Sequence, residues 1–276
     1  MIKSNVFETV NKGRIKLLKY KKLSDLFFVN HAISTRCGGV SVIKGLESLN
    51  LGTHTADSED NVCENYRRFC NAAGFDIEKL VLGNQTHSTN VRVVTEDDWG
   101  KGVMRERDYT DVDALITNLV KTPLVIHTAD CVPVGFIDKN GGAIGNAHCG
   151  WRGTYGELAS KTLHAMENEF GVRPENIVCT IGPCICMECY EVSRELYDDF
   201  EIKFGKSEAL CSKDGKYYID LSLINRHILV KNGVLPENII LSDLCTCCNH
   251  DFLFSHRGQG PERGIFASVL ELTSAI

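Results

Sequence analysis

Short apolar runs alternate with polar, glycine-containing segments along the chain, which predicts many short strands with several helices between them. The runs of strand length cover residues 14–18, 26–33, 80–83, 91–95, 111–117, 123–127, 132–138, 143–147, 177–182, 239–241, 252–256 and 265–270. Apolar side chains recur every three or four residues before Gly74, before Gly171, and after Ser193 and Leu221, which predicts helices there. No Pro/Ser-rich linker or internal repeat divides the chain. We therefore expect residues 1–276 to form one α/β (α+β) domain, a layered sandwich with a mixed β-sheet and flanking helices.

Two of these runs, 132–138 and 143–147, are joined by a segment that contains Asn-Gly, a dipeptide typical of hairpin turns. Antiparallel pairing of the two runs would bring Cys131 and His148 to the same open end of the hairpin. The chain then passes Arg152 and enters a predicted amphipathic helix, whose first backbone N–H groups have no partner within the helix. We expect two metal ligands beside an anion-binding segment at this end.

Cys131, His148 and His87 make up a set of side chains suited to a catalytic zinc ion, which typically has three protein ligands and one open position. His87 lies in a polar segment between two apolar runs, so we expect it in a loop or at a strand end. The same residue types also allow a nucleophilic Cys131 with His148 as its base. The remaining histidines lack comparable settings and are predicted to be structural or on the surface: His31, His54, His127, His164, His227 and His250.

A second group of candidate metal ligands consists of cysteines. Cys186-x-x-Cys189 and Cys245-x-x-Cys248 resemble the two halves of a structural zinc site. The halves are farther apart than in zinc ribbons, and two more cysteines lie among them. The pattern therefore favours packed free thiols over a second metal site.

Composition and charge indicate a small partner. The formal net charge is −6 and the Lys and Arg residues are scattered, which argues against nucleic-acid binding. No apolar segment has the length of a membrane span, and residues 1–14 lack the apolar core of a signal peptide. We expect a cytoplasmic protein, without a membrane partner, whose 13 cysteines stay reduced.

Three arginines lie in glycine-containing loops, where a guanidinium and nearby backbone N–H groups can bind a phosphate together. They are Arg36, Arg152 and Arg257. Any one of them could equally be a solvated surface residue. Arg152 is the strongest candidate because it follows His148 closely in the sequence.

Seven short motifs occur in order at residues 35–41, 48–52, 84–87, 128–133, 147–153, 181–185 and 254–257. From about residue 30 to the end, they resemble the YfiH/laccase-domain family, also called the polyphenol oxidase or purine nucleoside phosphorylase family. The sequence departs from this family at Cys149, where a small residue such as Ala is usual, and at His256, where Tyr is common. These two residues could supply a further thiolate and a further hydrogen-bond donor beside the predicted site.

The resemblance implies a single α/β domain in which His87, Cys131 and His148 hold a zinc ion and serve catalysis beside a nucleoside pocket. Members of the family are described as cleaving adenosine, inosine, guanosine and methylthioadenosine with phosphate, and as deaminating adenosine. We therefore expect a zinc-dependent purine nucleoside phosphorylase with adenosine deaminase activity. Its partners would be purine nucleosides and phosphate, and the protein would be a monomer or weak homodimer.

The motifs that carry the resemblance also contain the residues that we expect to bind substrate and phosphate: Arg36, Asn50, Arg152 and Arg257. Three other functions are alternatives. The first is copper-dependent oxidation of phenols, since a thiolate and imidazoles suit Cu²⁺ as well as Zn²⁺. The second is Cys–His amidase chemistry in peptidoglycan editing, and the third is a non-enzymatic, metal-stabilised binding module.

Overall fold

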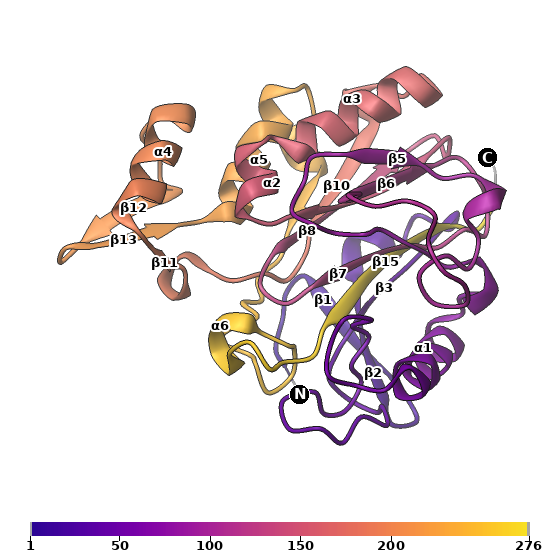
Figure 1. Ribbon diagram of the computed structural model, residues 1–276. Coiled ribbons are helices and arrows are strands. Elements are labelled where there is room, and N and C mark those ends of the chain that lie inside the picture. Colours follow the sequence, from indigo (N-terminus) through magenta and orange to yellow (C-terminus); the bar gives the residue numbers. More distant parts are fainter. Residues whose placement is uncertain (1, 275–276) are drawn as a thin grey trace.

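Two six-stranded mixed sheets pack face to face in the computed structural model, which describes residues 2–274 (Figure 1). In spatial order the first sheet contains β1 (Phe7–Lys12), β2 (Ile15–Tyr20), β3 (Val29–Ser34), β15 (Phe266–Leu272), β7 (Leu124–Thr128) and β4 (Val81–Leu82). The second contains β14 (Ile239–Leu241), β10 (Ile177–Ile181), β8 (Val132–Asp138), β9 (Ile144–Cys149), β6 (Ala114–Thr117) and β5 (Val91–Val93). Pairing is parallel for β4 with β7, β5 with β6 and β10 with β14, and antiparallel elsewhere in these two sheets.

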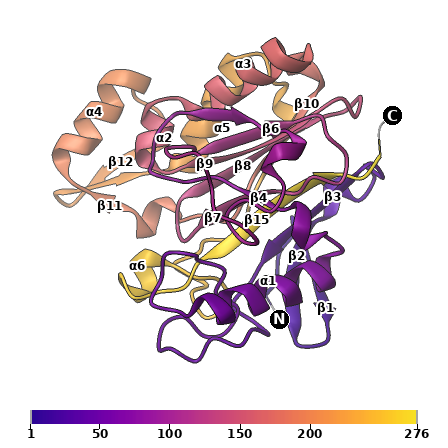
Figure 2. The ribbon, with the colours of Figure 1, turned by 45° about the vertical axis from the view of Figure 1, so that its right-hand side comes forward.

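Helices cover the outer faces of both sheets, so the molecule has four layers. The first sheet is covered by α1 (Glu59–Ala73), and the second by α2 (Trp151–Tyr155), α3 (Leu158–Phe170) and α5 (Leu221–Lys231). At one end, α4 (Arg194–Phe204) projects with a small sheet of β11 (Glu191–Val192), β13 (Lys216–Ile219) and β12 (Leu210–Lys213), as Figure 2 shows from a second side. A last short helix is α6 (His256–Gln259). The expected layered α/β sandwich is confirmed, with two mixed sheets rather than one.

The apolar core explains the sequence pattern of the central strands. One cluster lies between the two sheets and includes Ile137 and Ile144, while another lies between the second sheet and its helices and includes Val134 and Phe136. Because both faces of β8 are covered, all seven of its residues are buried. This is why the sequence has a continuous apolar run there rather than an alternating one.

The predicted hairpin of β8 and β9 is confirmed. The two strands pair antiparallel, with Pro133 opposite His148, so that Cys131 and His148 lie at the same open end. Two predicted helix ends are confirmed as well. Gly74 follows α1 with φ = 79° and Gly171 follows α3 with φ = 66°, left-handed conformations that only glycine adopts without strain.

Two predictions of local structure are wrong. Residues 252–256 form no strand but a loop that leads into α6, and this segment is apolar because Leu253 and Phe254 are buried in the core. The segment around Arg152, expected to be a loop that leads into the next helix, forms a short helix of its own, so the chain has two helices here, α2 and α3. They are separated at Glu157, whose φ of 57° is left-handed and so interrupts the helix.

No helix in residues 2–274 is both long enough and apolar enough to cross a membrane.

Candidate metal centre

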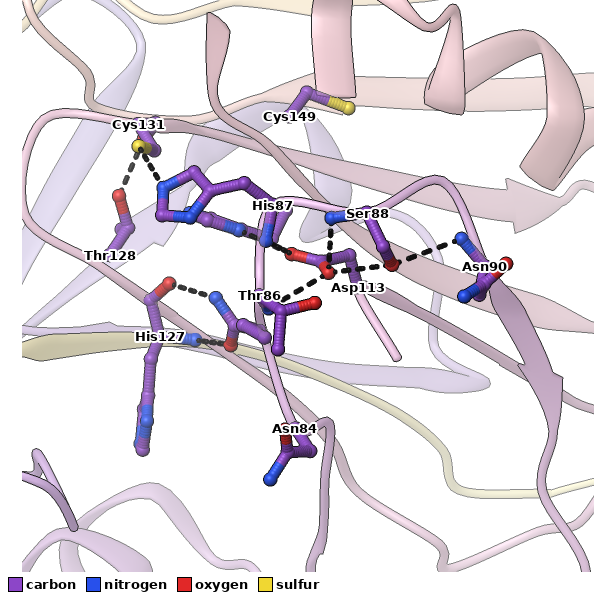
Figure 3. Close-up of polar contacts among 12 residues, drawn as sticks. Asn84, Thr86, His87, Ser88, Asn90, Asp113, His127, Thr128, Cys131 and Cys149 are labelled. Atoms are coloured by element: carbon purple, nitrogen blue, oxygen red, sulfur yellow. Dashed lines mark hydrogen bonds and ion pairs between the residues drawn. The ribbon is translucent and has the colours of Figure 1, made fainter. Parts of the chain in front are cut away.

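His87, Cys131 and His148 come together where the chain crosses between the two sheets. His87 lies in the connection from β4 to β5, and Cys131 in the turn from β7 to β8, so each connection leaves the first sheet and enters the second. His148 is on β9 beside them. One ligand atom from each residue lies within 4.8 Å of the other two. The Cys131 Sγ is 3.8 Å from His87 Nε2 (Figure 3). The imidazole rings of His87 and His148 have centroids 4.9 Å apart.

A buried carboxylate, Asp113, fixes two of these three side chains. Its Oδ1 is 2.9 Å from Nδ1 of His148, which leaves the Nε2 of that ring free for a metal. The same carboxylate accepts hydrogen bonds from the backbone N–H groups of Thr86, His87 and Ser88, at 3.0, 3.1 and 2.8 Å (Figure 3). These bonds hold the His87 backbone at φ = 66°, a left-handed conformation that is unusual for a residue with a side chain.

Electrostatics favour a charged Cys131–His148 pair. Burial alone would raise the pKa of the Cys131 thiol, but the charge and hydrogen bonds of His148 and His87 lower it to about 6. Burial alone would lower the pKa of His148, but the Cys131 thiolate and the Asp113 carboxylate raise it to about 9. Without a metal, a thiolate thus faces an imidazolium near neutral pH. This arrangement also fits the Cys–His dyad that the sequence allows.

The three donors fit zinc by their chemistry. One thiolate and two imidazoles are among the ligand sets that catalytic zinc sites use, and three ligands leave a position for water or substrate. The carboxylate behind His148 completes the carboxylate–histidine pairing found in such sites. Cys131 is half-buried and His87 is exposed, so the open side of the group faces solvent and the adjoining cavity.

A cavity of about 240 Å³ opens beside this group. Its wall carries all three candidate ligands together with both polar and apolar residues. It is lined by Gly52, Thr53, His54, Thr55, Gly83, Asn84, Gln85, His87, Arg107, His127, Thr128, Ala129, Cys131, His148, Arg263 and Ile265. The cavity therefore joins candidate metal ligands to two arginines, Arg107 and Arg263.

The two arginines differ in how their donors are used. Arg107 donates one hydrogen bond to the Gly83 carbonyl oxygen at 2.9 Å and lies 3.0 Å from the His54 ring nitrogen. Arg263 donates from Nη1 to the Pro261 carbonyl oxygen at 3.1 Å. Its Nε is buried and has no hydrogen-bond partner among the described residues. The Arg263 guanidinium thus makes a single hydrogen bond to the described part of the chain, and the residue contributes a positive charge to the cavity wall.

Two residues predicted to bind substrate, Arg36 and Asn50, lie outside the cavity lining. The Arg36 guanidinium donates to the carbonyl oxygens of Glu47 and His250 and packs over the Phe254 ring. Asn50 is fully buried.

Asn50 nevertheless shapes the cavity wall. Its Oδ1 accepts hydrogen bonds from the backbone N–H groups of Gly52 and Ile265, each at 3.0 Å, and its amide donates to Thr55 Oγ1 at 2.9 Å. All three partners line the cavity.

The other two predicted arginines also lie outside the cavity lining. Arg152 is exposed on α2 and its guanidinium stacks on the Trp151 ring. Arg257 donates to the carbonyl oxygens of Cys189 and Glu191 at 2.9 and 3.1 Å. Of the four side chains predicted to bind substrate or phosphate, Arg36, Asn50 and Arg257 thus form hydrogen bonds within the protein.

The two family departures lie apart from the ligands. Cys149 follows His148 on β9, and consecutive residues of a strand face opposite sides of a sheet. The Cys149 side chain is therefore fully buried against α3 and points away from Cys131 (Figure 3). Burial raises the pKa of its thiol, so it offers no thiolate near neutral pH. His256 is exposed at the start of α6.

Several residues that line the cavity were not predicted from the sequence. His54 and His127, expected to be structural or on the surface, both line the cavity. Arg107 lies in a run of charges that is indistinguishable from an ordinary surface segment. Arg263 precedes a glycine, as Arg152 and Arg257 do, so the same criterion could have found it. Asp113 could have been noticed in the sequence as a charged residue directly before an apolar strand.

The chain is similar to known proteins both in sequence and in fold. Residues 30–273 match the family described as multi-copper polyphenol oxidoreductase laccase. A purine nucleoside phosphorylase of Bacteroides thetaiotaomicron is 34% identical over 90% of this chain and 93% of that protein. An adenosine deaminase, RL5, from an unknown prokaryotic organism is 33% identical over 84% of this chain and 90% of that protein. The crystal structure of the Bacillus licheniformis hypothetical protein YfiH has a TM-score of 0.88 and 30% identity, covering 97% and 99% of the two chains.

The fold and the site thus define a mixed α/β protein with a candidate Cys–His metal centre at a junction between two sheets. The chain belongs to the YfiH/laccase-domain family, as its motifs implied. The names of these two relatives refer to purine nucleosides and adenosine, whereas the family description refers to polyphenols.

Proposed function

We propose that this protein is a zinc-dependent purine nucleoside phosphorylase. The observation that carries the proposal is the cavity itself, which places His87, Cys131 and His148 in one wall together with Arg107 and Arg263. Phosphorolysis of a nucleoside needs an anion site beside a sugar and base site. Two arginines in the cavity wall supply positive charge for the phosphate.

In this mechanism the chain's own residues mainly bind and orient. Arg263 and Arg107 hold phosphate beside the ribose C1′ and offset its charge, which makes the displacement effectively unimolecular. Asp113 keeps His148 in the tautomer whose Nε2 faces the cavity, and it anchors the His87 loop. A zinc ion held by His87, Cys131 and His148 would supply Lewis acidity and lower the pKa of a bound water.

The part of the cavity around His127 suits a flat, uncharged base. His127 lines it, and its Nε2 is hydrogen-bonded to the Tyr66 hydroxyl. Burial, together with the charge of Arg107, lowers the pKa of His127 to about 3, so the ring is neutral at physiological pH. We propose that a purine of adenosine, inosine, guanosine or methylthioadenosine lies against this wall.

Adenosine deamination is a second candidate reaction of the same centre. It is supported by the resemblance to a named adenosine deaminase and by the three-ligand set, which leaves room for a water molecule. Copper-dependent oxidation is less well supported, because within residues 2–274 only one candidate group contains histidine, and it offers a single thiolate and two imidazoles.

A direct assay tests the proposal. Purified protein with quantified zinc is incubated with inosine or adenosine, with and without phosphate, and free base, ribose 1-phosphate and ammonia are measured. We expect phosphate-dependent release of base and loss of that activity in Cys131→Ser. Ammonia should be released from adenosine but not from inosine. If zinc-loaded, folded protein yields neither base nor ammonia, the proposal is wrong. Oxygen uptake with a phenol in copper-loaded protein would instead favour the oxidase.

The variant Arg263→Met tests phosphate binding separately from nucleoside binding. Losing charge-assisted hydrogen bonds worth about 1.5–3 kcal/mol should raise the KM for phosphate roughly tenfold to a hundredfold while the KM for nucleoside changes little. Arg173→Met, at an exposed arginine outside the cavity lining, is the matched control and should leave both constants unchanged. An unchanged phosphate KM in Arg263→Met would rule out this anion site.

The cytoplasmic location and the monomer or weak homodimer that we expect from the sequence belong to the same proposal. Both suit an enzyme whose partners are nucleosides and phosphate.

A further inference from the structure

A second group of possible metal ligands lies outside the cavity. The sulfur atoms of Cys186, Cys189, Cys245 and Cys248 all lie within 4.8 Å of one another. From this geometry we propose a structural zinc site with four thiolate ligands, independent of the centre formed by His87, Cys131 and His148. The sequence favoured packed free thiols here, because the two Cys-x-x-Cys pairs are far apart along the chain.

The spacing of the sulfur atoms fits one tetrahedral ion. Zinc–sulfur bonds of about 2.3 Å in a tetrahedron place the sulfurs roughly 3.8 Å apart. The Cys189 and Cys248 sulfurs are 3.5 Å apart, and the whole group stays within 4.8 Å. In an iron–sulfur cluster the cysteines bind different iron atoms and must be spread more widely. The spacing therefore favours a single ion over a cluster.

Backbone amides already surround one sulfur as they do in metal–thiolate sites. The N–H groups of Cys186 and Cys248 donate to the Cys245 Sγ, at 3.2 and 3.4 Å. Hydrogen bonds from the backbone stabilise a thiolate more than a neutral thiol and orient it toward a metal. A cluster of merely packed thiols has no need of such donors.

The four cysteines come from two loops that lie far apart in the sequence. One loop follows β10 and the other follows β14, and they are joined by an isolated bridge between Cys184 and Cys245 and by a hydrogen bond from the Thr246 N–H to the Cys184 carbonyl. An ion held by both would close a long loop, which is where a crosslink restricts the unfolded chain most. Cys248 is exposed, so the ion could enter from solvent.

The loop after β14, together with the start of α6, also holds the turn before Cys131. The Asp130 carboxylate accepts hydrogen bonds from Thr246 Oγ1 at 2.5 Å, Ser255 Oγ at 2.7 Å and the Arg257 N–H at 2.6 Å. Asp130 itself has a left-handed φ of 97°. The four-cysteine site would thus support the backbone conformation that places Cys131 in the cavity.

Arg257 has a defined place in this arrangement. Its guanidinium donates to the carbonyl oxygens of Cys189 and Glu191, next to the cysteine group. Four thiols that lose their protons on binding Zn²⁺ leave a net charge of −2, which a neighbouring guanidinium offsets. The structure gives Arg257 this role at the second metal site, in addition to its backbone contact with Asp130.

Zinc stoichiometry tests the proposal without reference to enzyme activity. Protein purified under reducing conditions from zinc-supplemented medium is measured by mass spectrometry of its metals. We expect two zinc ions per chain in the wild type, one in Cys189→Ser/Cys248→Ser and one in Cys131→Ser. Cys247→Ser, in the same turn but outside the four-cysteine group, is the matched control and should keep two.

The Cys131→Ser protein keeps the test decisive if the double variant fails to fold. Its remaining ion, replaced by Co²⁺, should give the intense sulfur-to-cobalt absorption of four thiolates. Several results would overturn the proposal: a single zinc in the wild type that Cys131→Ser removes, iron in place of zinc, or a mass lower by two hydrogens that maps to a Cys189–Cys248 disulfide. A single zinc that only Cys189→Ser/Cys248→Ser removes would support this site and count against the one in the cavity.

Discussion

At the scale of single residues, Asp113 connects the candidate ligands to each other. It is completely buried and contacts both the His148 ring and the backbone that carries His87. Burial alone would raise its pKa, but the hydrogen bonds and charge of His148 and the backbone N–H groups of Thr86 and Ser88 lower it below its usual value. It therefore stays ionised and can act as a fixed acceptor.

Asp113→Asn should weaken zinc binding about tenfold to a hundredfold, because the amide cannot accept from all the same donors at once. Affinity is measured by competition with a chromophoric chelator. Asp111→Asn, two residues away and without contact to His148, is the comparison and should bind zinc much more tightly than Asp113→Asn. Equal affinities in the two variants would contradict the positioning role.

The charged Cys131–His148 pair makes zinc affinity depend on pH. Between about pH 6 and pH 9, Cys131 is a thiolate while His148 keeps its proton, and zinc requires the neutral imidazole. Binding therefore releases one proton from this pair, so affinity for the cavity site should rise roughly tenfold per pH unit across that window. Calorimetry of the Cys189→Ser/Cys248→Ser protein in buffers of different ionisation enthalpy measures this release. No proton release near pH 7 would show that His148 has already lost its proton beside the Cys131 thiolate.

At the scale of elements, the β8–β9 hairpin and the turn after it decide how close the ligands come. Alternation along β9 directs Asn146 and His148 between the two sheets and Cys149 toward α3. Directly after the strand, the chain passes the ligands so closely that only a residue without a side chain fits at Gly150. A Cβ there would lie 2.8 Å from His87 Cδ2 and 3.0 Å from Cys131 Sγ.

Gly150→Ala should therefore displace His87 or Cys131 and lower zinc affinity on the order of tenfold or more. Gly171→Ala is the control for general effects. No atom lies within 4 Å of its added Cβ, but its φ of +66° is strained, so it should lose about 1 kcal/mol of stability and keep its zinc affinity. Unchanged affinity in Gly150→Ala would mean that the ligand loops are free to move apart.

At the scale of the whole molecule, the site depends on the two sheets keeping their mutual position, because His87 and Cys131 lie on connections between them. The Asn146 side chain forms hydrogen bonds across the interface between the two sheets. From β9 in the second sheet, its amide donates to the carbonyl oxygens of Leu124 in β7 and Ser268 in β15, at 3.1 and 2.9 Å. Both acceptors belong to the first sheet.

Asn146→Ala should lower the free energy of unfolding by about 2–4 kcal/mol, since it removes two buried hydrogen bonds and leaves their carbonyl acceptors without this donor. Urea unfolding of zinc-free protein measures the change. The exposed Asn118→Ala is the reference and should change stability by less than about 0.5 kcal/mol. A similar stability for both variants would show that apolar packing alone fixes the two sheets.

Local features of the fold were predictable from sequence because they depend on neighbouring residues. The hairpin, the ends of α1 and α3, and the alternation of strands and helices follow from turn chemistry, glycine conformation and apolar spacing. The loop 252–256 was misread because burial in a core and pairing in a sheet produce the same apolar run. The interruption at Glu157 was not predicted, because a left-handed residue other than glycine is uncommon.

The sequence by itself determined the family, the hairpin that joins Cys131 to His148, and the residue types of a candidate metal site, because all of these lie in short contiguous motifs. Only the tertiary structure decided that Arg107, Arg263 and His127 line the cavity, that Cys149 points away from it, and that the two Cys-x-x-Cys pairs meet. The physical reason is that these side chains belong to segments far apart in the chain. Their proximity comes from the stacking of two sheets and the crossing of loops between them.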